Sequence, residues 1–296
     1  MTLAQSSSPY LKRHAQSLVR WRKWSSAALE EAAANQKPIY LSVGYFTCFW
    51  CHVMEQDVYS DQQIADYLNT HFIPIKVDRE EMPDIDEIYM AARELITQRS
   101  GWPNNVFLTP SGDPFLAVGV LVKDRRYGPS FPDVLEQVVT SWTNKHEDVL
   151  KGAAQIRALV DDRFTASLPE GDGTPDKSVA DDFFKYLQQH FDAECAGFYK
   201  SPKFSHESYL LFLQAATHAR EWPEASEMVE KTLVQMAASG LYDCIGGGFH
   251  RYTVDQEWQL PHFEKLLYSQ ALQARCYINW YEQSGHPLAK DIAEAT

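Results

Sequence analysis

The first part of the chain alternates between helical and strand-like spacing of its apolar residues. Residues 25–36 are rich in helix formers after a serine, which predicts a helix. The apolar, β-prone run at 39–43 predicts a buried strand, and residues 72–78 and 106–109 predict two more. Between the last two runs, residues 84–98 carry apolar side chains at helical spacing. This order of elements predicts a mixed α/β domain.

Turn and capping signals complete this domain. Ser60 and Gln63 form a predicted capping box for a short helix. Residues 110–113 carry turn-forming side chains, so a hairpin strand is expected at 115–120. Helices are expected over most of 131–163, starting near a serine that precedes a proline of the first turn.

A change of composition at residues 165–178 predicts a linker. Small and polar residues, proline and glycine replace the periodic pattern there. The linker would separate a mixed α/β domain at 1–164 from an all-α domain at 179–296. Helical spacing in the second domain is expected over 179–191, 206–219, 224–239, 262–284 and 287–296.

Composition and charge narrow the classes of protein. The chain has 296 residues, 45% of them hydrophobic, which is long enough for two domains with cores of their own. It carries 27 Lys and Arg against 40 Asp and Glu, so its net charge is −13. An acidic surface repels phosphate backbones and anionic membranes. We therefore expect neither a nucleic acid nor a membrane as a partner.

The sequence also bears on location. No apolar stretch approaches the ~18 residues that span a bilayer, and the first residues lack the apolar core of a secretory signal. Five cysteines, an odd number, fit a reducing compartment better than a disulfide framework. We expect a cytoplasmic protein. Basic residues without acids in the first 29 positions leave an organellar transit segment as the minor alternative.

The motif Cys48-Phe49-Trp50-Cys51 lies between a predicted strand and a helical stretch. At a helix N-terminus, backbone N–H groups and the helix dipole favour a thiolate on the first cysteine. The two-residue spacer lets the second thiol attack a mixed disulfide formed at the first. The motif therefore predicts a dithiol that exchanges with disulfides, and Trp102-Pro103 further along the chain makes this prediction more specific.

The cysteines permit other interpretations. With His52 the motif matches C-x-x-C-H, the attachment pattern of haem c, but that interpretation calls for an exporting signal and a distal ligand. Zinc needs two further Cys or His ligands at compatible spacing. Cys195, Cys244 and Cys276 are isolated and are expected to be small buried hydrophobes. A structural or zinc role for the pair remains the alternative, and we expect no metal and no cofactor.

The predicted second domain holds another group of candidate residues. Three glycines at 246–248 allow a close approach of the backbone to a ligand. Proton-transfer, hydrogen-bonding and aromatic side chains follow at His250, Arg251, Tyr252, Asp255, Trp258, His262 and Glu264. Aromatic rings beside carboxylates suit a carbohydrate ligand. The alternative, which we favour, is that these loops cap helices and fill space. The acidic run at 78–86 predicts a solvated face, with metal ligation as its alternative.

Further motifs run through the chain: Ser8-Pro9-Tyr10-Leu11, residues 37–45, 47–55 and 75–79, Pro83-Asp84-Ile85-Asp86, residues 101–103 and 106–110, Pro202-Lys203-Phe204, and residues 246–252 and 261–265. Together they resemble the spermatogenesis-associated protein 20 family of thioredoxin-domain proteins. The resemblance extends over almost the whole chain, although members of the family are usually about twice as long.

The resemblance implies a thioredoxin-like fold. In that fold Cys48 is the attacking thiol, Cys51 the resolving thiol, and Pro103 a cis-proline that faces them. The supporting residues would be Phe49, Trp50, His52, Glu55 and Trp102. The helical domain resembles the beginning of an (α/α)6 barrel, a six-hairpin barrel of the kind found in sugar 2-epimerases and some glycosidases.

Some positions depart from the relatives. The family usually has a histidine after the first cysteine, and Phe49 in its place removes a group that stabilises the thiolate. Ordinary thioredoxins carry a buried carboxylate where this chain has Ser42. Cys51 must therefore lose its proton to another acceptor, either water or Glu55. Residues 17–21 and 119–124 also differ from the family.

The sequence favours a thiol-disulfide oxidoreductase or redox-responsive protein that acts on an unidentified thiol or disulfide partner. The rival is a carbohydrate-binding or sugar-isomerising barrel with a structural or regulatory thioredoxin-like domain, and a protein-interaction module without turnover is the third hypothesis. The ~118 residues after the linker supply about five of the twelve helices of such a barrel. We therefore expect an incomplete barrel with exposed apolar helix faces, which would favour self-association.

Overall fold

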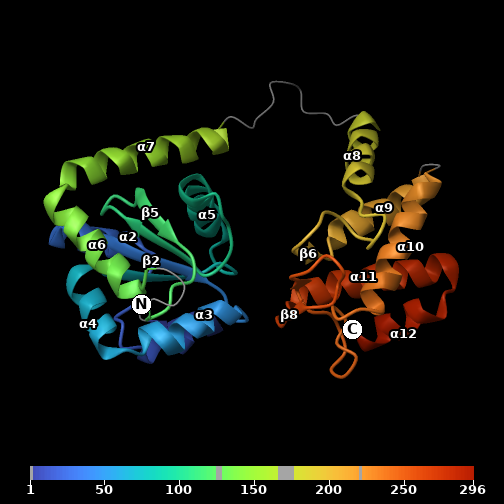
Figure 1. The fold of residues 1–296 in the computed structure, drawn as a ribbon, viewed down its shortest axis with the longest axis horizontal. Coiled ribbons are helices and arrows are strands. Elements are labelled where there is room, and N and C mark those ends of the chain that lie inside the picture. The colour runs from blue at the N-terminus through green and yellow to red at the C-terminus, as the bar shows by residue number, and fades with distance from the viewer. Residues whose placement is uncertain (1–2, 125–128, 166–176, 220–221) are drawn as a thin grey trace. The chain divides into compact units, whose positions relative to one another are not determined.

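The chain divides into two compact units, Met1–Pro169 and Glu170–Thr296 (Figure 1). The computed structural model describes residues 3–124, 129–165, 177–219 and 222–296. The centre of the predicted linker, residues 166–176, lies outside the described residues. Its two ends differ from the prediction, because Thr165 belongs to the preceding helix and Lys177 to the following one.

The first unit contains the predicted helices and strands of the α/β domain, with ends shifted by a few residues. Its elements are the 3-10 turns η1 (Leu3–Gln5) and η2 (His14–Gln16), the π-helical turn η3 (Glu55–Tyr59), the helices α1 (Pro9–Arg13), α2 (Ser26–Asn35), α3 (Phe49–Met54), α4 (Gln62–His71), α5 (Pro83–Thr97), α6 (Phe131–Asn144) and α7 (His146–Thr165), and the strands β1 (Arg22–Lys23), β2 (Ile39–Gly44), β3 (Ile73–Asp78), β4 (Asn104–Leu108) and β5 (Pro114–Val118).

The five strands form one mixed sheet in the order β1-β3-β2-β4-β5. β2 runs parallel to β3 and antiparallel to β4, and β4 and β5 form the predicted hairpin. Every residue of β2, β3 and β4 is buried. These central strands are covered on both faces, which explains why they appear in the sequence as nearly continuous apolar runs.

Different helices cover the two faces of the sheet. Leu41 shares a buried cluster with apolar side chains of α2 and α5. Successive side chains of a strand point to opposite faces, so Tyr40 enters the other core. There its ring lies 5.2 Å from the ring of Phe107 and 5.5 Å from that of Phe131 in α6. Burial of each such side chain stabilises the fold by roughly 1.5–3 kcal/mol. This burial holds β2 in place, and the dithiol motif follows β2 after a short turn.

One predicted helix start is confirmed, and one predicted helix cap is wrong. Ser130 and Asp133 form a capping box at the start of α6. At the start of α4, Asp61 is the capping residue, and its Oδ1 accepts hydrogen bonds from the backbone N–H groups of Gln63 and Ile64 at 2.9 and 3.2 Å. Ser60 lies one residue too early to cap this helix, and its hydroxyl donates to a backbone carbonyl of the preceding turn.

The second unit is largely helical. Its elements are α8 (Lys177–His190), α9 (Glu207–Ala219), α10 (Pro223–Ala237), α11 (Leu267–Ser284) and α12 (Pro287–Ala295), with the strands β6 (Lys203–Phe204), β7 (Tyr252–Thr253) and β8 (Pro261–His262). The small antiparallel sheet β6-β7-β8 corrects the all-α expectation. It also explains why α11 begins at Leu267 rather than at residue 262, since residues 261–262 pair with β7.

Two loops of the second unit share one structure that the sequence analysis did not detect. In each loop, an aspartate follows the first of two bridged aromatic residues and accepts hydrogen bonds from two backbone N–H groups and one lysine. The first loop contains the bridged pair Phe191–Phe198, with Asp192 and Lys203. The second contains the bridged pair Tyr242–Phe249, with Asp243 and Lys265. In both loops the aspartate Oδ2 lies 2.5 Å from the lysine Nζ. Burial raises the pKa of Asp192, but the hydrogen bonds outweigh it and lower that pKa to about 2.

Large apolar side chains are exposed on the second unit. The exposed fractions of Ile245, Phe263 and Leu267 are 96%, 76% and 86%.

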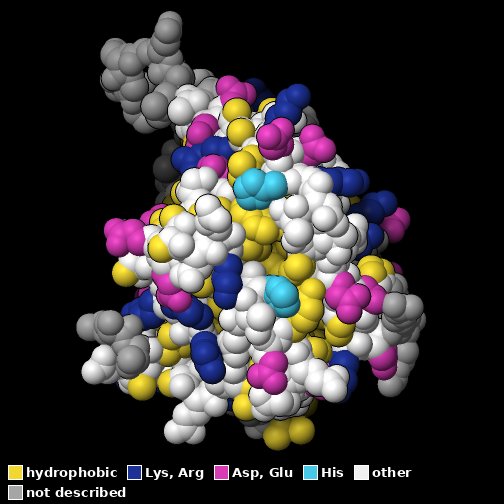
Figure 2. Space-filling view, turned by 90° about the vertical axis from the view of Figure 1, so that its left-hand side faces the viewer, with side chains coloured by type: hydrophobic (Ala, Val, Ile, Leu, Met, Phe, Trp, Pro, Cys, Tyr) yellow, Lys and Arg dark blue, Asp and Glu magenta, His cyan; other side chains and the backbone are white. Residues whose placement is uncertain are grey.

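On the face of the first unit in Figure 2, acidic and basic side chains are interspersed with hydrophobic ones. Within the described ranges, no helix has both the length and the apolar character that a membrane crossing requires.

Candidate functional site

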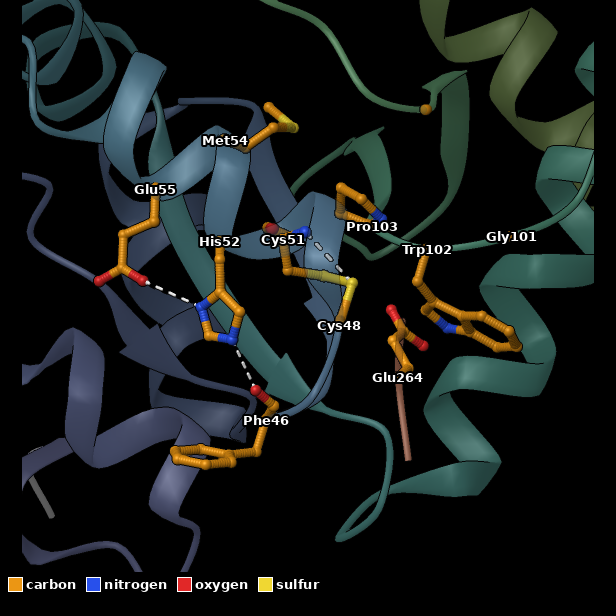
Figure 3. Close-up of a disulfide and its surroundings, with 12 residues drawn as sticks. Phe46, Cys48, Cys51, His52, Met54, Glu55, Gly101, Trp102, Pro103 and Glu264 are labelled. Atoms are coloured by element: carbon orange, nitrogen blue, oxygen red, sulfur yellow. Dashed lines mark hydrogen bonds and ion pairs between the residues drawn. A yellow bond between two sulfur atoms is a disulfide. The ribbon is translucent and has the colours of Figure 1, made fainter. Parts of the chain in front are cut away.

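Cys48 and Cys51 lie at the start of α3, directly after β2 and a short turn (Figure 3). Cys48 is the N-cap residue, and its Sγ accepts a hydrogen bond from the backbone N–H of Cys51 at 3.2 Å. The two cysteines are joined by a disulfide, with their Cα atoms 5.3 Å apart. Because the first N–H groups of a helix are unpaired, this position stabilises negative charge on the Cys48 sulfur once the disulfide is reduced.

The loop before β4 brings Pro103 next to the disulfide (Figure 3). The Trp102–Pro103 peptide bond is cis, as the resemblance implied. Arg93 of α5 donates hydrogen bonds through Nη1 to the carbonyl oxygens of Gly101 and Pro103, the latter at 3.1 Å. One buried guanidinium therefore holds the backbone on both sides of the cis bond.

A second support comes from the acidic run, which the sequence analysis assigned to a solvated face. That assignment is wrong for Asp78 and Asp86, which are both buried. Asp86 Oδ1 accepts a hydrogen bond from Trp102 Nε1 at 2.8 Å, and the guanidinium of Arg79 stacks 4.1 Å from the Trp102 ring. Burial raises the pKa of Asp86, while the Trp102 hydrogen bond and Arg79 act in the opposite direction.

His52 and Glu55 form a separate group on α3 and the following turn. His52 Nε2 donates to the carbonyl of Phe46 at 2.7 Å, and its Nδ1 lies 3.8 Å from Glu55 Oε2. The same Glu55 oxygen accepts a hydrogen bond from Arg13 Nε at 3.0 Å. In Figure 3, His52 points away from the disulfide and toward these partners. Glu55 is therefore engaged with the cation of Arg13, which weakens the expectation that it takes the proton of Cys51.

Exposed aromatic side chains border the motif. The exposed fractions of Phe46, Phe49 and Trp50 are 48%, 49% and 43%. The rings of Phe49 and Trp50 pack edge to face at 5.2 Å. We call these three residues the aromatic rim, and it gives the surroundings of the disulfide an apolar surface.

A buried polar cluster behind β2 and β3 was missed by the sequence analysis. Lys76 of β3 is 1% exposed, and its Nζ lies 3.3 Å from the hydroxyl of Ser42, its register partner on β2. The Nζ atom also lies 4.4 Å and 4.5 Å from the ring centroids of Trp21 and Tyr59. The only hint in the sequence was one lysine inside an otherwise apolar strand.

The N-terminal segment closes this cluster. Ser8 Oγ donates to Asp78 Oδ2 at 2.5 Å and fixes the start of α1 against the end of β3. This places Tyr10 and His14 in the core, where the ring of Tyr10 meets that of His14 edge to face at 5.0 Å. Burial, with help from the charge of Lys76, lowers the pKa of His14 to about 2, so this imidazole is neutral at physiological pH.

The structure separates the candidate residues of the second unit into two sets. Glu264 is buried and accepts hydrogen bonds from Arg251 Nη1 and His262 Nε2, each at 3.1 Å, while the ring of Tyr252 stacks on that of His262 at 4.8 Å. His250 packs edge to face on Phe263. Arg251, His262 and Tyr252 therefore form one polar and aromatic group around Glu264.

Asp255 and Trp258 have structural contacts instead. Asp255 accepts hydrogen bonds from the backbone N–H groups of Gln259 and Leu260 and so closes the loop before β8. Trp258 is fully buried, and its Nε1 donates to the carbonyl of Cys195 at 2.9 Å. These contacts match the packing alternative for both residues.

The three remaining cysteines differ in exposure. Cys276 is buried, as predicted, and burial raises its pKa to about 12. Cys195 is partly exposed and Cys244 is exposed, so the expectation of buried hydrophobes is wrong for Cys244. In the portion of the chain that the structure describes, no three His, Cys, Asp or Glu side chains are grouped so that they could hold a metal.

The mixed sheet, the N-capping cysteine and the neighbouring cis-proline define a thioredoxin-like domain with a CxxC pair. Residues 1–161 match the family model Thioredox_DsbH, described as a protein of unknown function, DUF255. The chain belongs to this family.

Relatives match both units. The chain is 40% identical over 285 residues to an uncharacterized protein of Caenorhabditis elegans, covering 95% of this chain and 38% of that protein. It is 35% identical over 298 residues to spermatogenesis-associated protein 20 of Homo sapiens, covering 99% of this chain and 38% of the human protein. The resemblance seen in the sequence is confirmed, and the chain spans 38% of the length of these relatives.

Solved structures resemble the first unit at low identity. A structure titled DsbH oxidoreductase is 20% identical, with a TM-score of 0.29, and the match covers 45% of this chain and 85% of that one. A thioredoxin from Thermus thermophilus is 23% identical, with a TM-score of 0.32, and the match covers 41% of this chain and 88% of that one.

Proposed function

We propose that the first unit is a thiol-disulfide oxidoreductase domain that reacts through Cys48 and Cys51. The observation that carries this proposal is the position of Cys48 Sγ at the N-terminus of α3, 3.2 Å from the Cys51 N–H and beside cis-Pro103. A thiolate at this position is stabilised by the helix, and a second thiol three residues further along is placed to displace whatever the first one captures.

The reaction proceeds in two exchanges. The Cys48 thiolate attacks one sulfur of a substrate disulfide, whose other sulfur leaves with the bonding electrons and takes a proton from water. The Cys51 thiolate then attacks Cys48 and releases the second substrate sulfur, also as a thiolate. The substrate disulfide is reduced, and the Cys48–Cys51 dithiol is oxidised to the disulfide present in this structure.

The surroundings suit a protein partner. A polypeptide that pairs with the backbone of a neighbouring loop binds as an extended chain. The aromatic rim adds apolar surface for side chains on either side of a partner's cysteine. The partner class that we propose is therefore an extended polypeptide segment around a cysteine or a disulfide.

Trapping tests this proposal. Cys51→Ser should leave Cys48 in a stable mixed disulfide with a cystine-containing peptide, whereas Cys48→Ser should form none. Both variants should carry Cys195→Ser and Cys244→Ser, because these accessible thiols would otherwise capture the peptide without any relation to the motif. Equal trapping by the two variants would contradict the roles proposed for the cysteines.

A carbohydrate ligand for the second unit is the second candidate function. The observation that favours it is the group around Glu264, in which a carboxylate, a guanidinium, an imidazole and a stacked tyrosine ring lie together. Saturation-transfer NMR with a panel of monosaccharides should show binding that Tyr252→Ala removes. Signals that persist unchanged in this variant would contradict a site at this group.

A further inference from the structure

The dithiol mechanism requires Cys51 to lose a proton inside the protein. Cys51 is 3% exposed, and Ser42 occupies the position where ordinary thioredoxins carry a buried carboxylate. Glu55, the carboxylate suggested by the sequence, is paired with Arg13. His14 is a poor acceptor, because its pKa is lowered to about 2 by burial. Besides water, the acceptor must therefore be a different group.

Tyr10 is the polar side chain that reaches the space beside Cys51. It is fully buried, and its hydroxyl has no hydrogen-bond partner among the described residues. A Cβ atom added to Gly44 would lie 2.5 Å from Tyr10 Oη and 2.7 Å from Cys51 Sγ. The hydroxyl and the sulfur therefore face the same small space, which stays open because residue 44 is a glycine.

Lys76 lies over the ring of Tyr10. Its Nζ is 5.5 Å from the centroid of the Tyr10 ring. Burial lowers the pKa of Lys76 to about 7, and the charge of Glu55 offsets part of this effect. An amine with this pKa is partly neutral at physiological pH and can accept a proton. The titratable groups around it are Tyr10, His14, Tyr40, Glu55, Tyr59 and Asp78.

We propose that Tyr10 and Lys76 form the proton route of Cys51, with the Tyr10 hydroxyl bonded to the reduced Cys51 sulfur and the neutral Lys76 amine as the acceptor. The inference rests on the proposed dithiol function. As Cys51 gives its proton to Tyr10 Oη, the tyrosine passes its own proton to Lys76 Nζ through a hydrogen bond that forms in the reduced protein, since the hydroxyl has no partner among the described residues of the disulfide form. The resulting Cys51 thiolate forms the bond to Cys48, and the substrate sulfur leaves with the electrons of the broken bond.

The two exchanges can be timed separately with one equivalent of 5,5′-dithiobis(2-nitrobenzoate). Attack by Cys48 releases the first thionitrobenzoate, and attack by Cys51 on the mixed disulfide releases the second. The full chain should carry Cys195→Ser and Cys244→Ser, because these thiols are accessible. In the wild-type background the second release should accelerate with pH around a midpoint near 7, as Lys76 becomes neutral.

Lys76→Met and Tyr10→Phe should each slow the second release at least tenfold at pH 7 and leave the first release within twofold. Lys76→Met should also remove the midpoint near pH 7. The matched control is Tyr40→Phe, because the Tyr40 hydroxyl is equally buried but bonded to Tyr59 and Asn105. If Lys76→Met fails to fold, Tyr10→Phe carries the test alone, since the hydroxyl that it removes has no partner among the described residues.

Two results would overturn the inference. One is a second release with wild-type rate and pH profile in the folded Lys76→Met or Tyr10→Phe protein. The other is a tenfold slowing in Glu55→Gln but not in Lys76→Met, which would make Glu55 the acceptor. A wild-type chain with no first release would instead contradict the proposed dithiol function, and the proton route with it.

Discussion

At the scale of single residues, the buried amine of Lys76 couples stability to pH. Its pKa is about 7 in the folded protein and 10.5 when exposed. Between these values the unfolded chain binds a proton that the folded chain does not, so the free energy of unfolding rises with pH from about 7 to about 10.5. Below pH 7 both states are protonated, and the folded protein bears the full cost of the buried charge.

Lys76→Met should therefore stabilise the protein at neutral and acidic pH. We expect a gain of roughly 1–4 kcal/mol at pH 6, as for other replacements of buried charges by apolar side chains. The gain should shrink as the pH rises toward 10, where wild-type Lys76 is neutral. Urea unfolding of both proteins at pH 6, 8 and 9.5 measures this difference in the free energy of unfolding. A difference that is the same at all three pH values would show that Lys76 does not couple stability to pH.

Gly44 is a second residue on which the site depends. Its missing side chain leaves the space shared by Cys51 Sγ and Tyr10 Oη, so a methyl group there must displace both. Gly44→Ala should lower the free energy of unfolding by roughly 1–3 kcal/mol. Gly152→Ala in α7 is the matched control, because an added Cβ meets nothing within 4 Å there and should stabilise the helix by up to ~1 kcal/mol. If thermal unfolding shows no loss of stability for Gly44→Ala, the added methyl group does not crowd Cys51 and Tyr10.

Phe49, the residue after the attacking cysteine, bears on the redox potential. It is half exposed and packs on Trp50, so a histidine fits without rebuilding the core. In Phe49→His, an imidazolium near the Cys48 sulfur should stabilise the thiolate and therefore the reduced form, which raises the reduction potential of the pair. Equilibration of both proteins with glutathione measures the change. An unchanged potential would indicate that this side chain points away from the sulfur.

At the scale of elements, helix α5 supports the proline loop. Arg93 holds two carbonyls around the cis bond with one planar guanidinium, which a lysine cannot reproduce. Arg93→Lys should lower the free energy of unfolding by roughly 1–3 kcal/mol and slow exchange at Cys48. Arg157→Lys in α7, at an exposed ion pair with Asp161, should change stability by less than about 1 kcal/mol. Equal effects of the two substitutions on stability and on exchange would contradict the supporting role of Arg93.

The elements also show which parts of the structure the sequence pattern is sufficient to predict. The buried strands were predicted because β2 and β3 are largely apolar on both faces, and the dithiol because its two cysteines have the spacing for exchange. Lys76 could not be placed, since its burial depends on an N-terminal segment that folds over β3 from far along the chain. Asp86 was misassigned for the same reason, because its partner Trp102 lies on another element. The start of α11 was missed because strand pairing with β7 overrides helical spacing.

At the scale of the whole molecule, the exposed apolar side chains of the second unit favour association. Ile245 and Leu267 are almost fully exposed, and such surface is costly in water. The full chain should therefore show a sedimentation coefficient that rises with protein concentration. The double variant Ile245→Glu, Leu267→Glu should reduce that rise. The wild-type chain remaining monomeric at all concentrations would contradict self-association.

The central claim is that Cys48 and Cys51 exchange electrons with other thiols in the folded protein. The most direct measurement equilibrates the full chain over a series of glutathione ratios, from both the reduced and the oxidised side, and counts alkylated cysteines by intact mass. We predict that the pair converts in one reversible two-electron step, with both approaches giving the same midpoint, and that Cys48→Ser abolishes the step. A Cys48–Cys51 bond that no glutathione ratio opens while the protein remains folded would be a structural bridge and would contradict the claim.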